Sequence, residues 1–167
     1  MKKVLPLLVT LVMMTIIAMI VVSMAQQEQP ITIAKGNMAM QPLPIKLNFT
    51  NDTQCKMLIK KEENSAQAIA PDGRTWFFDD PGCLVLWLQG KAFKESAKLW
   101  VHTLDTNRWI DAKTAYYGIT DHTEMHYGFG AREHSTDTTI NYDEMQLRML
   151  RGENLTDPKI RKKLLGE

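Results

Sequence analysis

An uncharged apolar run near the N-terminus constrains this chain more than any other feature of its sequence. Lys2 and Lys3 precede the run, which covers residues 4–22, and a polar stretch begins at Gln26. A cleavable export signal has an apolar core of about 7–15 residues, whereas a membrane-spanning helix needs about 20. Residues 1–25 are therefore expected to be a signal anchor or a signal peptide.

The two fates of this leader give different mature proteins. Retention would hold the protein in the inner membrane through a transmembrane helix over residues 4–22, whereas cleavage after Ala25, which ends a small-x-small triplet, would release it. The length of the run favours retention. In both cases the lysines stay inside, so the body is expected to be extracytoplasmic, on the periplasmic side.

Charge excludes one class of partner. The chain has 20 Lys and Arg against 19 Asp and Glu, and without the two leader lysines the balance is 18 against 19. A protein held to nucleic acid by phosphate contacts carries a clear basic excess. No nucleic-acid partner is therefore expected.

The rest of the chain divides into three parts. Residues 26–44 contain three prolines and one glycine among polar residues, with no sustained period, which is typical of a tether. Residues 45–152 are long enough for one core and form the expected folded domain. Residues 153–167 are expected to be a loosely held, charged tail.

The folded domain shows strands followed by a helix, twice, which predicts a compact α+β fold. Strands are expected at 55–59, 67–69, 75–78, 98–105, 109–110, 114–119 and 124–131. A first helix is predicted from the cap residue Asp80 to Gly90, with Pro81 at its first position. A second is predicted over residues 142–151, with Asn141 as its cap and Gly152 at its end.

Two cysteines and a methionine carry the most informative chemistry. In an extended strand, Cys55 and Met57 would share one face, and paired soft sulfur ligands select Cu(I) over harder ions. Core packing is the more common reason for such a pair. Cys83 falls in the first turn of the predicted helix, where the helix dipole favours thiolate, although a buried structural role is the alternative. In an oxidising compartment, a Cys55–Cys83 disulfide is also possible.

The remaining patterns are less specific. Standard catalytic motifs are missing, which argues against a conventional enzyme. His122 and His126 lie four residues apart, as in some zinc sites, but the surrounding residues favour a strand and two exposed histidines. Met38 and Met40 repeat a same-face sulfur pair within the tether, with no role assigned.

Several short motifs, in order, cover most of the body from residue 51 to residue 151. They are Cys-x-Met-x-Ile at 55–59, Gln-Ala-Ile at 67–69, Gly73, Phe-Asp-Asp at 78–80, Cys83, Asp105, Trp-Ile-Asp-Ala at 109–112, Ala-Tyr-Tyr at 115–117 and Thr-x-Met-x-Tyr-Gly-Phe-x-Ala at 123–131. In order and spacing, this set resembles the NosL family of nitrous oxide reductase accessory proteins.

The resemblance implies a fold and a function. It implies two related ββαβ-type units, similar in fold to the organomercurial lyase domain, and a Cu(I)-binding metallochaperone that supplies nitrous oxide reductase or a related copper enzyme. A copper donor protein would load it. Cys55, Met57 and Met125 match the metal ligands, with His126 and Cys83 as secondary candidates.

The chain departs from the family pattern in two places. Members are typically lipoproteins, yet no cysteine precedes Cys55, so the apolar leader would replace the lipid. Glu124 and His126 stand where the family usually has small residues. The alternative function is a non-metal extracytoplasmic interaction module stapled by a Cys55–Cys83 disulfide. A thiol enzyme related to mercury-carbon lyases is disfavoured, because it needs paired thiols beside a carboxylate and only Cys55 is expected to be exposed.

Overall fold

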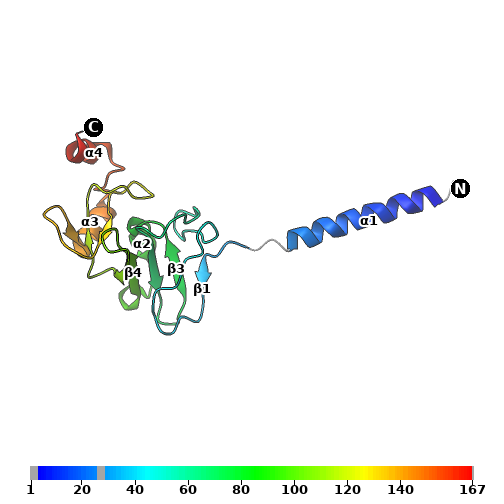
Figure 1. Ribbon diagram of the computed structural model, residues 1–167, viewed down its shortest axis with the longest axis horizontal. Helices are drawn as coiled ribbons and strands as arrows, with labels where there is room; N and C mark the ends of the chain where they lie inside the picture. The colour runs from blue at the N-terminus through cyan, green and yellow to red at the C-terminus, as the bar shows by residue number, and fades with distance from the viewer. Residues whose placement is uncertain (1–3, 26–28, 167) are drawn as a thin grey trace. The chain divides into compact units, whose positions relative to one another are not determined.

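The computed structural model describes residues 4–25 and 29–166 (Figure 1). The chain divides into two compact units, Met1–Pro30 and Ile31–Glu167. Lys2, Lys3 and Gln26, on which the topology and cleavage of the leader depend, lie outside the described residues.

The first unit consists of helix α1, Val4–Ala25. Its sequence is uncharged, and Thr15 donates its hydroxyl to the carbonyl of Val12 within the helix. Among the residues that the structure describes, no helix is both long and apolar enough to cross a membrane. The transmembrane anchor expected from the sequence is therefore without structural support.

The second unit is a mixed α+β fold, which confirms the predicted class. Its elements are β1 Ile33–Ala34, β2 Ala66–Ile69, β3 Thr75–Phe78, α2 Pro81–Leu88, the short 3-10 helix η1 Lys94–Ser96, β4 Lys98–His102, β5 Trp109–Asp111, β6 Tyr116–Tyr117, β7 Ala131–Arg132, β8 Ile140–Asn141, α3 Tyr142–Arg151 and α4 Pro158–Leu165.

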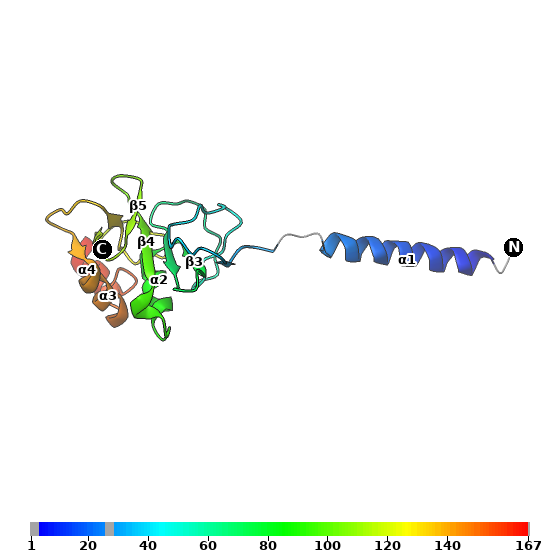
Figure 2. The same cartoon turned by 90° about the horizontal axis from the view of Figure 1, so that it is seen from below.

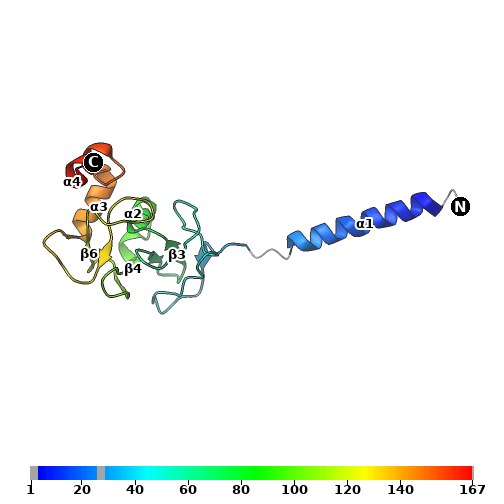
Figure 3. The ribbon, with the colours of Figure 1, turned by 45° about the horizontal axis from the view of Figure 1, so that its top comes forward.

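Two antiparallel sheets form the β part. The larger has the order β1-β3-β2-β4-β5, and the smaller has the order β7-β6-β8. In the centre of the larger sheet, Ala66 of β2 pairs with Phe78 of β3 and with Val101 of β4. Helix α2 packs on β2 and β3 and also contacts α3, so the main core lies between α2 and the sheet (Figures 2 and 3).

Both predicted helix starts are confirmed by their caps. Asp80 accepts a hydrogen bond from the Gly82 N–H at 2.7 Å, and Asn141 accepts one from the Glu144 N–H at 2.9 Å. These bonds satisfy donors that have no partner within the helix. The Gly82 position leaves no room for a side chain, because a Cβ there would lie 2.5 Å from the Tyr127 ring.

Residues 31–44 belong to the folded unit, so the prediction of a tether over 26–44 is wrong for this part. Strand β1 pairs with β3, and the buried Gln67 side chain binds both the N–H and the carbonyl of Leu43, at 2.9 and 2.7 Å. The Gln67 amide thus pairs with the segment much as a neighbouring strand would. Such pairing leaves no periodic pattern in the sequence of the segment.

The C-terminal segment is also more ordered than expected. Leu155 is buried and donates its N–H to the carbonyl of Tyr127 at 3.1 Å. Asp157 then caps α4, which contains most of the predicted tail. The predicted strands at 98–105 and 114–119 are each reduced to a shorter strand, because turns begin within them. The predicted strand at 124–131 is wrong, because this segment is a loop of which only Ala131 enters a strand.

Asp105 links the turn after β4 to the segment after β7. Its carboxylate accepts backbone hydrogen bonds from Glu133 and His134, both at 3.0 Å. Partial burial raises the pKa of Asp105, but these N–H groups lower it more, to about 2. The unfolded pKa is near 3.9, so the ionised carboxylate stabilises the fold above about pH 4 and this contribution is lost as the pH falls toward 2.

Replacing Asp105 with Asn should therefore lower the free energy of unfolding by about 1 kcal/mol at pH 7, after allowance for solvent screening. The difference from the unmodified protein should shrink between pH 4 and pH 2. Urea unfolding across this pH range measures it. The exposed Asp137, changed to Asn, is the matched control; an equal effect of both substitutions would contradict the assignment.

Candidate metal site

The structure gathers two thiols and two carboxylates at one place. The ligand atoms of Asp52, Cys55, Asp79 and Cys83 all lie within 4.8 Å of one another. The loop before residue 58 supplies Asp52 and Cys55, the end of β3 leads to Asp79, and the first turn of α2 supplies Cys83. Both cysteines are free thiols.

Asp52 organises the site through three backbone hydrogen bonds. One carboxylate oxygen accepts from the N–H groups of Gln54 and Cys55, at 2.5 and 2.7 Å, and the other accepts from the Asp79 N–H at 2.9 Å. Asp52 is fully buried, so these bonds replace its lost hydration. They also fix Cys55 beside Asp79.

The two thiols differ in access to solvent. Cys55 is half-buried, and its Sγ lies 3.8 Å from both carboxylate oxygens of Asp79. Cys83 is fully buried within the main core cluster. Access to the site is therefore on the Cys55 side.

The surroundings favour the neutral forms of both thiols and of Asp79. Burial and the negative charges of Asp52 and Asp79 raise the pKa of Cys55 to about 12. Burial raises the pKa of Cys83 far above its ordinary range, with the nearby acids adding to the effect. Burial and the neighbouring Asp52 raise the pKa of Asp79 to about 8. Of the two interpretations of Cys83, the buried one is confirmed, and the helix-start thiolate is not supported, because desolvation outweighs the helix dipole.

The predicted strand at 55–59 is also wrong. The Asp52 N–H donates to the Met57 carbonyl at 2.8 Å, the Lys56 N–H donates to the Asp52 carbonyl at 3.1 Å, and Lys56 has a φ of 70°. These features define a tight turn, so Cys55 and Met57 are not neighbours on one strand face. Cys55 instead meets Cys83, which the sequence made only a secondary candidate.

The other predicted ligands lie on the loop before β7 and beside the turn. Met125 packs against the core and donates its N–H to Asp80 at 3.2 Å. His126 contacts His122, with ring centroids 5.3 Å apart, and both line a groove that also contains Arg161. Met57 is 45% exposed. The assignments of Met57, Met125 and His126 as ligands stay predictions.

Sequence reasoning missed the two carboxylates of the cluster. Asp79 stood within the Phe-Asp-Asp motif, and its position between a predicted strand and a predicted helix cap was a usable signal. Asp52 carried no such signal, because its role depends on backbone N–H groups of a turn that the sequence did not predict.

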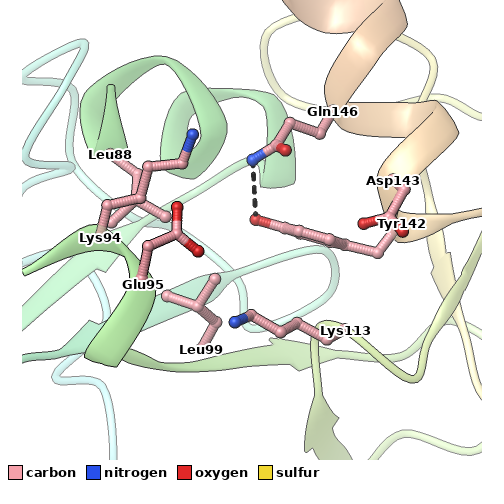
Figure 4. Close-up of a pocket in the computed structure, with 8 residues that line it drawn as sticks. All are labelled: Leu88, Lys94, Glu95, Leu99, Lys113, Tyr142, Asp143 and Gln146. Carbon is pink, nitrogen blue, oxygen red and sulfur yellow. Dashed lines mark hydrogen bonds between the residues drawn. The ribbon is translucent and has the colours of Figure 1, made fainter. Parts of the chain in front are cut away.

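A separate cavity of about 150 Å³ lies between η1 and α3 (Figure 4). Its lining residues are Leu88, Lys94, Glu95, Leu99, Lys113, Tyr142, Asp143 and Gln146. The Tyr142 hydroxyl points into it and accepts a hydrogen bond from Gln146 at 3.5 Å (Figure 4). Its lining contains no sulfur ligand and charges of both signs, so the thiol cluster is the stronger candidate for metal chemistry.

The donor set fits a thiophilic ion. A zinc–thiolate bond is about 2.3 Å long, so two sulfurs on one such ion are at most about 4.6 Å apart. The Cys55 and Cys83 sulfurs lie within 4.8 Å, so little movement brings both onto one ion. Two thiolates suit Cu(I), whereas two thiolates with two carboxylates also suit Zn²⁺. The chain matches no protein-family model and no curated protein.

The raised pKa of Cys55 predicts slow alkylation that keeps accelerating with pH. In the native, reduced protein, iodoacetamide should modify Cys55 about tenfold faster for each pH unit up to pH 10, because the thiolate fraction is still rising. Cys83 should stay unmodified until the protein is unfolded. Mass spectrometry of the two cysteine peptides measures both rates. In denaturant, both rates should level off above about pH 9; a plateau below pH 9 in the native protein would contradict the prediction.

Proposed function

We propose that the protein is an extracytoplasmic Cu(I)-binding metallochaperone whose cargo ion is held by Cys55 and Cys83. The observation that carries this proposal is the pair of free thiols whose sulfur atoms lie within 4.8 Å of each other, close to the span of one ion. Cu(I) is a soft ion that prefers thiolate, and two thiolates leave it open to ligand exchange with a client. The protein acts as a carrier and not as an enzyme.

The client and the location rest on the sequence. The resemblance to the NosL family favours nitrous oxide reductase, or a related copper enzyme, as the client, and a copper protein as the donor. The apolar leader favours export, with the folded unit on the periplasmic side. The order β2-β3-α2-β4 supports one ββαβ unit of the implied pair. In the second half, α3 follows β8, and no strand follows α3 in the described chain, so a second such unit has less support.

Copper affinity tests the proposal. In competition with a chromophoric chelator, the full chain should bind one Cu(I) and prefer it to Zn²⁺. Cys55→Ser and Cys83→Ser should each lower the Cu(I) affinity at least tenfold, because each removes one of two thiolates. Asp52→Asn and Asp79→Asn should weaken Zn²⁺ binding more than Cu(I) binding, because carboxylate oxygens are hard ligands.

The contrary outcomes separate the alternatives. Equal or tighter Zn²⁺ binding that depends on Asp52 and Asp79 would make this a four-ligand zinc site. If neither cysteine substitution altered copper binding and mass analysis showed a Cys55–Cys83 bridge, the stapled interaction module would replace the chaperone. Urea unfolding of the Cys83→Ser variant is the control, because Cys83 is also a core residue.

A mercury-carbon lyase is the second candidate, and one observation favours it. The argument against it was that it needs paired thiols beside a carboxylate and that only Cys55 was expected to be exposed. The structure brings Cys55, Cys83 and Asp79 together, although Cys83 is buried. In such a reaction, the carbon–mercury bond breaks, a proton passes to the carbon, and Hg(II) stays on the two thiolates. Release of methane from a methylmercury salt by the wild-type chain, and its loss in Asp79→Asn, would support this candidate over the carrier.

A further inference from the structure

A groove opens beside the thiol cluster. It is lined by Met57, Leu58, Lys60, Asp79 and Glu124. Asp79 belongs both to this groove and to the cluster, so the groove reaches the site from outside. Cys83 and Asp52 are fully buried behind it.

Met57 gives this groove a soft ligand of its own. Its side chain is 45% exposed, although it is apolar, and the neighbouring Leu58 is also exposed. The turn that ends at Met57 is held by the bond between the Asp52 N–H and the Met57 carbonyl. Met57 is therefore tied to the same aspartate that positions Cys55, yet its side chain lines the open groove.

We propose that Met57 is a transfer ligand: it receives the Cu(I) cargo in the groove and passes it to Cys55 and Cys83, and it acts in reverse during release. This inference rests on the proposed function. It assigns Met57 a role in the rate of exchange, in place of the resident ligand role that the sequence suggested.

The chemistry of the two sulfur types explains why the thioether transfers the ion and the two thiols hold it. A thioether binds Cu(I) without losing a proton, so Met57 can accept the ion from a donor complex by exchanging one ligand for another. A thiol must be deprotonated before it binds a metal. Movement of the ion onto Cys55 and Cys83 therefore forms two copper–sulfur bonds, breaks the bond to Met57 and releases two protons to solvent, with no change in oxidation state.

The partner that fits this groove presents a soft ligand in an exposed position. Its thiolate or thioether would replace Met57 on the ion, while its apolar surroundings would cover Leu58. Lys61 forms an ion pair with Glu124 at 2.9 Å, which neutralises that carboxylate, and Lys60 is the cation of the groove lining. A soft, weakly charged donor segment is the complementary surface.

Exchange kinetics test the proposal, because a transfer ligand changes rates without changing the equilibrium. Met57→Leu keeps the size and apolar character of the side chain and removes the sulfur. In stopped-flow mixing of the full chain with a Cu(I) complex of a chromophoric chelator, this variant should load at least fivefold more slowly. Excess chelator should also remove the ion at least fivefold more slowly. The dissociation constant should change by less than about twofold, since both rates fall together.

Met38→Leu is the matched control, because Met38 is 68% exposed and does not line the groove. It should leave both rates unchanged. Unchanged rates in Met57→Leu would overturn the inference while the carrier function stands. Faster removal with weaker binding would also overturn it, by making Met57 a resident ligand. If the wild-type chain takes up no Cu(I), the proposed function itself fails, and the inference fails with it.

Discussion

The candidate site depends on one buried carboxylate. Asp52 accepts hydrogen bonds from the backbone N–H groups of Gln54, Cys55 and Asp79 and so joins an irregular loop to the end of a regular strand. The Thr53 N–H also donates to the Phe77 carbonyl of β3 at 2.8 Å, so two points of the loop are tied to this strand and its end. Because the bonds to Asp52 are charge-assisted and removed from water, they are stronger than ordinary surface contacts.

The start of α2 supplies the second half of the arrangement. Asp80 caps the helix and also accepts the Met125 N–H, so one carboxylate connects the helix start with the loop before β7. Gly82 lets the Tyr127 ring lie against the helix at this point. As a result, Cys83 is fully buried, and its sulfur lies close to Cys55, Asp52 and Asp79.

Much of the regular structure could be predicted from the sequence, because local signals specify it. Asp80 with Pro81 predicted the first helix, and Asn141 with Gly152 predicted the second. The predicted ends of both helices lie within one or two residues of the observed ends. The site was harder to predict. The expected partner of Cys55 was Met57, two residues away, whereas the structure brings Cys55 close to Cys83, which is distant in sequence. Strand periodicity implied the first pairing, and a turn around Asp52 produces the second.

The folding of residues 31–44 was missed for a related reason. Leu43 is held by the side chain of Gln67, and Met40 accepts a hydrogen bond from the Trp100 indole at 3.0 Å. Side chains from elsewhere supply these bonds, so composition within the segment itself suggests only a polar, proline-containing linker. Tertiary hydrogen bonds of this kind have no counterpart in local propensity.

Under the proposed function, the acidic surroundings of the thiol pair limit how tightly the ion is held. Binding Cu(I) releases two protons and adds one positive charge, so the site gains one negative charge. Asp52 lies within 4.8 Å of the sulfurs, and its buried carboxylate repels that charge. A thiol pair with neutral neighbours would therefore bind Cu(I) more tightly. In a protein that must release its ion, this repulsion favours release. In a permanent metal site, the same repulsion would only weaken binding.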